Sequence, residues 1–386
     1  MFFILKYTNF WYNILCMEVK ELTLTNFRNY KEQTIKFNSG LNVLVGNNAQ
    51  GKTNVLEAIF MCAIGKSVRV KKDKDLIMWG KEFSKISIST TKANFNKNIN
   101  IYLFQNQNKA IKINSVPIKK MGQLMGEFNA IYFCPDDLKL VKESPEERRR
   151  FMDIDLSQLN KIYFYALVKY NKILAQRNKL LKTSKDLKTL YDTISIWNEQ
   201  LADCGATIIK YRLDFVNLLK KFAFDAQNYL TENKENLELE YSGIVGENEE
   251  EIKKILLNEL NNSVEKDFDL GYTTIGPHRD DIKIVVNGID IRHFGSQGQQ
   301  RTCALSLKLA ELEIFNSILG EYPVLLLDDV LSELDIGRQI RLLNKIKNIQ
   351  SIITCTEFNF DVKCTRYSIA NGNLELTLKT NWQFNF

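Results

Sequence analysis

The stretch GNNAQGKT, residues 46–53, follows the short apolar run LNVLV and precedes the helix-forming run TNVLEAIFMCAI. It fits the pattern G-x-x-x-x-G-K-[ST] with Gly46, Gly51, Lys52 and Thr53. Because the pattern lies between a predicted strand and a predicted helix, it predicts a P-loop rather than an ordinary glycine-bearing turn. In a P-loop the glycines let backbone N–H groups surround phosphate oxygens, and the helix N-terminus favours their negative charge. The stretch therefore predicts a nucleotide site.

A second motif far along the chain supplies the acids that such a site needs. The run VLLLDD, residues 324–329, places two carboxylates at the end of a buried strand. In a P-loop protein Lys52 would reach the outer phosphates and Thr53 a magnesium ion, with Asp328 orienting the magnesium shell. Asp329 would polarise an attacking water. Acid pairs after a strand are also common helix caps, but together with the P-loop they predict ATP and Mg²⁺ as cofactors.

Roughly 270 residues separate the P-loop from these acids, which is enough for another domain. SELD, residues 332–335, follows the acids as a D-loop would. FGSQGQQR, residues 294–301, precedes them and is similar to the ABC-type signature, whose common form is LSGGQ. Ser296, Gly298 and Gln299 match that form, although a Gly/Ser cluster at a helix start is also an ordinary N-cap. The three motifs in order predict an ABC-type ATPase.

Composition excludes several other classes of protein. The chain has 386 residues, 45% of them hydrophobic and 25% charged, as in ordinary soluble globular proteins. The net charge of +6 is only a modest lean toward polyanions. Seven scattered cysteines without a CxxC pair, and only two histidines, argue against a zinc site or a disulfide scaffold. We expect a cytoplasmic protein without stable membrane association.

The first 16 residues are apolar but are interrupted by Lys6 and are too short to span a bilayer. Met17 begins a stretch that reads as a fresh start, so we expect residues 1–16 to be a disordered extension or the product of a mis-set start. Residues 17 to about 114 show mainly the strand period, with a further strand that ends at Pro135, and residues 146 to about 233 show the helical period. Strands return at residues 237–245 and 282–291, the latter as a hairpin that turns at Asn287-Gly288.

Six blocks carry a resemblance to a known family. They are LTNFRNY (24–30), GNNAQGKTNVLEAI (46–59), SPEERRRFMD (144–153), GPHRDD (276–281), GSQGQQR (295–301) and LLLDDVLSELD (325–335). In this order they resemble the RecF family of bacterial DNA replication and repair proteins, relatives of the SMC ATPases without their coiled coils. The resemblance implies an α/β fold: an ABC-type P-loop ATPase head, with a mixed sheet plus an antiparallel sheet, and an inserted mainly helical arm. The head halves would be residues 17–145 and 271–386, with the arm at 146–270.

The resemblance also implies a function in DNA damage repair and the SOS response. It implies a homodimer that forms with ATP on gapped, single-stranded or duplex DNA and helps RecO and RecR to load RecA recombinase. The site residues that it implies are Arg28 on the phosphates, Asn47, Asn48, Ala49 and Gln50 along the loop, and Ser296, Gly298 and Gln299 at the signature. The catalytic set would be Lys52, Asp329 and Ser296, with Ser296 meeting the γ-phosphate held by Lys52 of a second copy.

The chain departs from the ABC-type pattern in two places. SIITCT, residues 351–356, has no switch histidine, with Thr356 near its place, and no clear Q-loop glutamine lies around residues 133–138. These departures predict a weak, switch-like ATPase, and the resemblance implies that DNA stimulates it. The densest basic stretches, residues 66–74 and 147–151, are the candidates for DNA contact, against a solvated face or pairing with Glu146 and Glu147. For His278 we expect a structural role.

Two functions of other classes compete with this one. The first is the ATPase subunit of a membrane transporter, against which the large insert and the missing Q-loop weigh. The second is the ATPase of an SMC-like nuclease complex, but the sequence shows no cluster of acids and histidines that resembles a metal nuclease centre.

Overall fold

The structure, a computed structural model, describes residues 15–92, 95–370 and 373–379. Most of the expected N-terminal extension and the predicted turn at Asn371-Gly372 therefore lie outside the described residues. Cys16, at the start of the described chain, forms a parallel bridge with Tyr322.

A mixed six-stranded sheet lies at the centre of the head, with the strand order β15-β14-β3-β13-β12-β8. Its strands are β3 (Leu41–Val45), β8 (Ala130–Phe133), β12 (Val324–Asp328), β13 (Ser351–Cys355), β14 (Thr365–Ala370) and β15 (Asn373–Lys379). All neighbouring pairs are parallel except β14 and β15. Because the carboxyl ends of parallel strands share one edge, the P-loop after β3 and the acids that end β12 meet there, with β13 between them.

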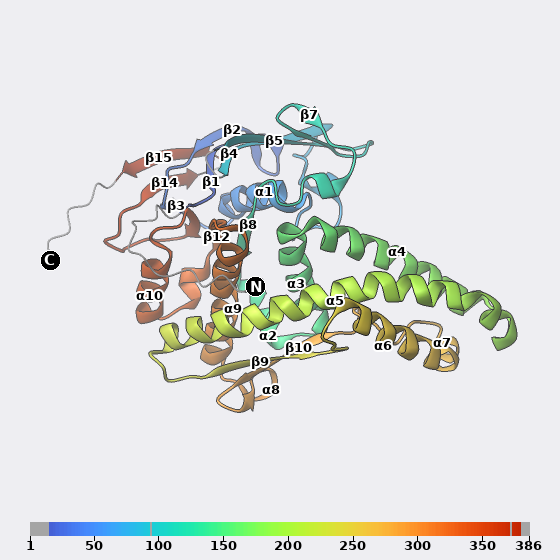
Figure 1. Cartoon of the computed structure of the whole chain (residues 1–386). Coiled ribbons are helices and arrows are strands. Elements are labelled where there is room, and N and C mark those ends of the chain that lie inside the picture. The colour runs from blue at the N-terminus through green and yellow to red at the C-terminus, as the bar shows by residue number, and fades with distance from the viewer. Residues whose placement is uncertain (1–14, 93–94, 371–372, 380–386) are drawn as a thin grey trace.

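A second six-stranded sheet is antiparallel, with the order β2-β1-β4-β5-β6-β7. Its strands are β1 (Glu18–Phe27), β2 (Tyr30–Lys36), β4 (Phe83–Lys92), β5 (Phe95–Phe104), β6 (Ala110–Ile113) and β7 (Val116–Pro117). Helix α1 (Lys52–Ile64) lies between the two sheets (Figure 1) and shares one apolar core with both. Eleven of its thirteen residues are buried, which holds the P-loop at its N-terminus in a fixed place.

The other face of the mixed sheet is covered by helices from the second half of the chain. They are α9 (Gln297–Leu319) and α10 (Ile336–Ile346), joined by the C-terminal part of α5. Strand β12 is buried on both faces. Val324 and Leu326 face the core around α1, whereas Leu325 and Leu327 face the core around α9. A strand buried on both faces needs apolar residues at every position.

A helical arm extends from the head (Figure 1). Its helices are α3 (Pro145–Leu159), α4 (Lys161–Thr183), α5 (Leu187–Thr231), α6 (Glu249–Asn262) and α7 (Val264–Leu270), after the short α2 (Lys139–Lys142). Asn160 and Asp186 cap α4 and α5 by accepting hydrogen bonds from backbone N–H groups. The arm's core packs α4, α5 and α6 together, and it continues into a third sheet. Helices α6 and α7 were not foreseen from the sequence.

The third sheet is antiparallel, with the order β11-β10-β9. It joins β9 (Leu237–Ser242) to β10 (Asp281–Val286) and β11 (Ile289–Asp290), which leads into α8 (Ile291–Phe294). The predicted hairpin at Asn287-Gly288 is confirmed, with φ of 52° and 77° at these residues. Four 3₁₀ turns, η1 (Asp73–Leu76), η2 (Met121–Gln123), η3 (Pro135–Leu138) and η4 (Val330–Glu333), complete the described elements.

The predicted α/β fold, with a mixed sheet, an antiparallel sheet and substantial helical content, is confirmed. No helix in the described part of the chain is long and apolar enough to cross a membrane.

Candidate nucleotide site

The P-loop closes tightly because two of its positions leave no room for a side chain. At Gly46 an added Cβ would lie 2.5 Å from the carbonyl oxygen of Ile369 on β14. Gly51 has a φ of 109°, and there a Cβ would lie 2.5 Å from the amide of Asn29. Asn29 also donates to the carbonyl of Gln50 at 3.0 Å, and the Tyr30 hydroxyl donates to that of Gly51 at 3.1 Å. The antiparallel sheet thus braces the loop from the side.

Lys52 lies inside the loop that it belongs to. Its side chain is buried, and its ammonium group donates hydrogen bonds to the carbonyl oxygens of Gly46 and Asn47. Asn48 and Ala49, at the tip of the loop, are exposed. The arrangement holds one positive charge at the centre of a ring of backbone groups, next to the positive end of α1. Both features favour a bound phosphate.

Thr53 and Asp328 are 275 residues apart in the sequence, and their side chains are in contact, as the two motifs predict. The Thr53 hydroxyl donates to Asp328 Oδ1 at 2.8 Å, and that oxygen also accepts from the hydroxyl of Thr354 on β13 at 2.7 Å. Tyr132, on β8, donates to Asp328 Oδ2 at 2.9 Å. Burial and then the adjacent Asp328 raise the pKa of Tyr132, so its hydroxyl stays protonated and remains a donor. Three hydroxyl groups from three elements orient this carboxylate.

This pair of residues fits a magnesium ion of the kind that P-loops hold. Mg²⁺ takes oxygen ligands and usually keeps phosphate and water in its shell, so one hydroxyl and one carboxylate suffice from the protein. Thr53 and Asp328 are the residues that would hold it. A dedicated protein cage is not present in the described residues, where no three histidine, cysteine or acidic side chains are grouped as metal ligands.

Asp329 differs from Asp328 in having an uncommitted oxygen. Its backbone N–H donates to Thr354 Oγ1 at 3.0 Å, and its φ is 54°, in the left-handed region. The side-chain Oδ1 is buried and has no hydrogen-bond partner among the described residues. A buried carboxylate oxygen without a partner costs free energy, and such atoms are often found where a reaction needs them. The position suits an acid that accepts a proton from, or orients, a water beside the nucleotide.

Arg28 is held by an acid on α1 one turn after Thr53. Its guanidinium donates to both oxygens of Glu57 at 3.1 Å, and it also contacts the carbonyl of Asp75 at 3.3 Å. Glu57 is fully buried and also pairs with Arg69 at 3.5 Å and accepts from Ser67 at 2.5 Å. Glu57 thus fixes two cations near the P-loop helix. The proposed phosphate contact of Arg28 stays a prediction.

The signature residues lie at the far end of the same chain. Ser296 caps α9: its Oγ accepts from the N–H of Gln299 at 3.2 Å, and Gln299 Oε1 accepts from the N–H of Ser296 at 3.0 Å. Gly298 is exposed, with open space beside it. Figure 1 shows α8, which leads into this end of α9, on the opposite side of the molecule from α1. The structure therefore does not bring Ser296, Gly298 or Gln299 to Lys52 of their own chain.

Sequence reasoning missed three residues that build the site. Thr354 forms hydrogen bonds with Asp328 and Asp329. Thr356, which was named from the sequence instead, directly follows β13 and is exposed. Tyr132 and Glu57 were also not foreseen. Glu57 lies on the P-loop helix at i+4 from Thr53, and an acid in an otherwise apolar helix is the signal that could have found it.

The arginines of the stretch at 147–151 have different partners. Arg148 is buried and pairs with Asp281, at 2.6 Å and 3.0 Å. Arg149 donates to the carbonyl of Asp280 at 2.8 Å. Arg150 donates to the carbonyl of Val68 and lies 4.0 Å from Glu147. Arg148 is thus structural, while the other two remain partly exposed.

Comparison with known proteins places this site in a family. The family described as RecF/RecN/SMC N terminal domain matches residues 18–368. A DNA replication and repair protein RecF of Clostridium novyi is 47% identical over 340 residues, covering 88% of this chain and 93% of that protein. A solved structure of the recombination mediator protein RecF with ATP, in the RecFOR pathway, has a TM-score of 0.87 and 38% identity, covering 96% and 100%. The Smc head domain of Pyrococcus furiosus, 17% identical with a TM-score of 0.54 and coverage of 94% and 96%, shares the fold. The chain belongs to the RecF family of DNA replication and repair proteins.

Proposed function

We propose that the chain is an ATP-controlled DNA-binding protein of recombinational repair in the cytoplasm. It binds gapped or junction DNA as an ATP-dependent homodimer and acts with RecO and RecR to load RecA recombinase. Membership of the RecF family and the ATP-bound relative in the RecFOR pathway support this proposal. The observation that carries it is the joining of Lys52, Thr53 and Asp328 at one sheet edge.

ATP is held by the P-loop in this proposal. Phosphate oxygens take the place of the carbonyls of Gly46 and Asn47 as partners of Lys52, and the N–H groups of residues 47–53 surround them. Thr53 and Asp328 are the residues that would hold Mg²⁺, whose charge would offset that of the outer phosphates. Thr354 and Tyr132 keep the Asp328 carboxylate in one orientation, which reduces the reorganisation that metal binding requires.

Hydrolysis is slow because each chain carries only part of the catalytic set. Asp329 is the one acid beside the site with a free buried oxygen among the described residues, and no histidine lies on β13 to assist it. The signature serine that would complete the γ-phosphate shell lies at the far end of the chain. A second copy in a two-fold arrangement supplies it, so ATP joins two chains and its hydrolysis releases them.

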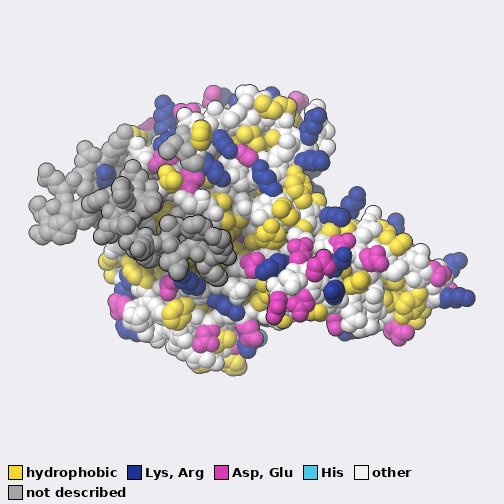
Figure 2. Space-filling view, in the orientation of Figure 1, with side chains coloured by type: hydrophobic (Ala, Val, Ile, Leu, Met, Phe, Trp, Pro, Cys, Tyr) yellow, Lys and Arg dark blue, Asp and Glu magenta, His cyan; other side chains and the backbone are white. Residues whose placement is uncertain are grey.

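DNA contact in this proposal is made mainly to phosphates by the basic residues that follow α1, namely Arg69, Lys71, Lys72 and Lys74. Figure 2 shows Lys and Arg side chains spread over the visible face and interleaved with acids along the arm, rather than gathered in one stripe. Binding through scattered phosphate contacts does not read base sequence and weakens steeply with salt.

The test measures the dissociation constant for a labelled gapped duplex with and without ATP and Mg²⁺, over a series of salt concentrations. We expect binding to tighten at least tenfold with ATP and to weaken as salt rises. Equal binding with and without ATP would contradict ATP control, and a flat salt series would contradict phosphate contact. Lys71→Ala with Lys72→Ala should reduce the salt slope, with Lys31→Ala and Lys36→Ala on strand β2 as the matched control.

A further inference from the structure

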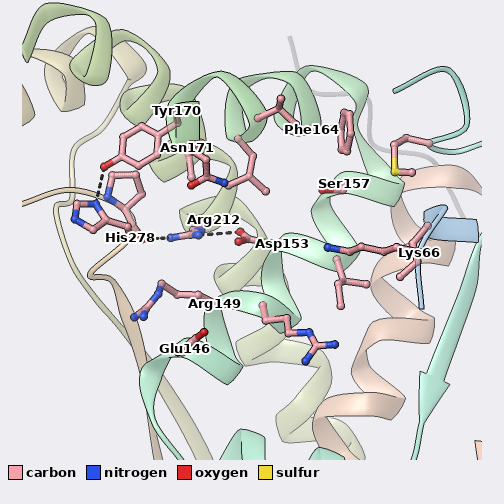
Figure 3. A pocket seen from close by; sticks show the side chains of 18 residues that line it. Lys66, Glu146, Arg149, Asp153, Ser157, Phe164, Tyr170, Asn171, Arg212 and His278 are labelled. Carbon is pink, nitrogen blue, oxygen red and sulfur yellow. Dashed lines mark hydrogen bonds and ion pairs between the residues drawn. The ribbon is translucent and has the colours of Figure 1, made fainter. Parts of the chain in front are cut away.

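A cavity of about 450 Å³ lies where the head meets the arm (Figure 3). Its walls come from four elements: the end of α1 and the loop after it, then α3, α4 and α5. The loop of the GPHRDD motif closes one side with Pro277 and His278. The nucleotide site does not include this cavity, since none of Lys52, Thr53, Asp328 and Asp329 lines it.

The GPHRDD loop forms a rigid wall with a neutral histidine. His278 Nε2 lies 3.0 Å from the carbonyl of Thr273 and so carries the proton, which leaves Nδ1 to accept from the Tyr170 hydroxyl at 2.7 Å. Burial lowers the pKa of His278 to about 4, consistent with this neutral tautomer. Gly276 has a φ of 127°, and a Cβ there would lie 2.4 Å from the Tyr170 hydroxyl. The motif thus presses the loop against α4.

At the centre of the cavity one guanidinium, that of Arg212, is already paired with two carboxylates. Arg212 donates to Asp153 at 2.8 Å and to Asp280 at 3.3 Å, and it also donates to the carbonyl of Pro277. Figure 3 shows this pair between His278 on one side and Lys66 on the other. Arg212 and the two carboxylates therefore stabilise the cavity wall, and Arg212 has no uncompensated positive charge that could bind a ligand.

Two of the remaining cations of the cavity have no carboxylate partner among the described residues. Lys66, Arg149 and Arg150 line it, with Glu146 as the only other acid in the lining beside Asp153. Among the described residues Lys66 has no hydrogen-bond or ion-pair partner, and Arg149 has no carboxylate within 4.0 Å, its printed partner being the carbonyl of Asp280. Burial and then Arg150 lower the pKa of Lys66. Like charges brought together in a half-enclosed space indicate a site for an anion.

Polar and apolar groups around these cations indicate the chemistry of the anion. Ser157 is buried at the cavity wall, and its hydroxyl has no partner among the described residues, so it is a free donor. Phe164, Leu167 and Val168 on α4 give an apolar wall. Cations and a hydroxyl beside an apolar wall match a phosphate attached to a sugar and base, better than they match a small inorganic anion.

We propose that this cavity binds the terminal phosphate of a nucleotide unit, carried by the end of a DNA strand or by a free nucleoside monophosphate. Lys66 and Arg149 are its cationic contacts, and Ser157 is a further donor. The strand-end source rests on the DNA binding proposed above. Phosphates inside a duplex lie on a convex surface and meet surface lysines, whereas a concave pocket admits only a strand end or an unpaired nucleotide.

The experiment compares two gapped duplexes that differ only in whether the strand ends at the gap carry a phosphate or a hydroxyl group, at each end in turn. Dissociation constants are measured with ATP by fluorescence anisotropy. We expect the wild-type protein to bind a phosphorylated end about tenfold more tightly. Lys66→Gln with Arg149→Gln should abolish that preference. Lys66→Gln alone, at a residue without a hydrogen-bond or ion-pair partner among the described residues, should reduce it severalfold.

The control is Lys31→Gln with Lys36→Gln, which removes the same charge from an exposed edge strand and should keep the preference. Calorimetry with thymidine 5′-monophosphate and with inorganic phosphate separates the sources. Monophosphate binding that Lys66→Gln weakens, without a strand-end preference, assigns the cavity to a free nucleotide. No strand-end preference and no such monophosphate binding overturns the proposal. Loss of ATP-dependent binding to the hydroxyl-ended duplex would instead contradict the proposed function, and calorimetry would still decide the cavity.

Discussion

The P-loop and the start of α9 belong to one proposed catalytic set, yet they are built in opposite ways. Around the P-loop, Lys52 and Asp328 are buried; Lys52 is held by two carbonyls of the loop, and Asp328 by hydroxyl groups from three elements. At the start of α9, the side chains of Ser296 and Gln299 bond, among the described residues, only to each other's backbone N–H groups, and the space beside Gly298 is open. We call these two regions the two half-sites. The P-loop half-site is held in place by its own chain, so it can bind ATP alone. The α9 half-site makes only its own helix-cap hydrogen bonds, so it can act only when the P-loop of a second chain is placed against it.

The largest effect should come from the half-site that is complete. Lys52→Ala removes the charge at the centre of the P-loop, and we expect ATP affinity to fall about a thousandfold, since two or more charge-assisted hydrogen bonds are lost. Equilibrium binding of a fluorescent ATP analogue measures this. Lys71→Ala, at an exposed lysine of the basic loop, is the control. ATP affinity within threefold of wild type in Lys52→Ala would break the assignment of the P-loop.

The next effect separates binding from chemistry within the same half-site. Asp329→Asn keeps the shape of the side chain and tolerates the left-handed backbone at φ 54°, because Asn and Asp both adopt that region. We expect hydrolysis about a hundredfold slower, from loss of a general base, with ATP affinity within about threefold. Asp328→Asn should instead weaken Mg²⁺-dependent ATP binding. Wild-type turnover by Asp329→Asn would remove Asp329 from the chemistry.

What the sequence could predict follows the same division between local and distant contacts. Gly46 to Thr53 form one turn of chain between a strand and a helix, so their geometry is local and the motif predicts it. Asn287-Gly288 is likewise local, and its positive φ values were predicted correctly. Thr354 and Tyr132 reach Asp328 only because β8, β12 and β13 lie side by side, an order that a single sequence does not reveal. The cavity beside His278 is lined by residues from α1, α3, α4 and α5, which are far apart in the sequence, so no sequence motif predicts it.

A cluster of charged side chains lies between α9, α3 and the turn after β8. Lys308 and Glu311 on α9 pair at 2.8 Å and face Asp155 on α3 and Asp137 on η3, the turn after β8. Burial raises the pKa of both Asp155 and Glu311, that of Asp155 to about 7. Burial also raises the pKa of Asp137. Three acids with one lysine hold a proton at this joint.

That proton gives the third prediction. Between the ordinary pKa of Asp155, 3.8, and about 7, the folded protein keeps a proton that the unfolded chain releases, so the free energy of unfolding falls as pH rises through this window. Asp155→Asn keeps the neutral form and removes that dependence. We expect its stability to match wild type below about pH 4 and to exceed it progressively toward pH 7, by about 1.4 kcal/mol per pH unit.

Denaturant unfolding of both proteins at several pH values measures this difference. His278, whose pKa is lowered to about 4, contributes a slope of the opposite sign, but it is present in both proteins and cancels. Asp136→Asn, an exposed acid of the same turn, is the control and should leave the slope unchanged. A pH-independent difference between Asp155→Asn and wild type would show that Asp155 is ionised in the folded protein, and the joint would then be an ordinary ion-pair network.

The smallest effect is the sharpest test of the comparison, because it asks whether the two half-sites meet across two chains. Lys52→Ala destroys one half-site, and Ser296→Arg fills the other with a bulky side chain. Each variant alone should be inactive. Mixed in equal amounts, half of the dimers are hybrids, each with one doubly damaged site and one intact site, so random pairing recovers about a quarter of wild-type ATPase activity.

If the site is built within one chain, the same mixture recovers no ATPase activity, because every chain then carries one of the two substitutions. Two differently tagged variants, recovered together in the presence of ATP, establish that hybrids form. Hybrids without activity would contradict the shared site, and they would leave the isolated cap of α9 without a role in hydrolysis. Activity near a quarter of wild type would show that the exposed serine of one copy completes the buried phosphate loop of the other. The contrast in how the two ends are held would then follow from the work they share: one end binds ATP before the dimer forms, and the other must stay free until it does.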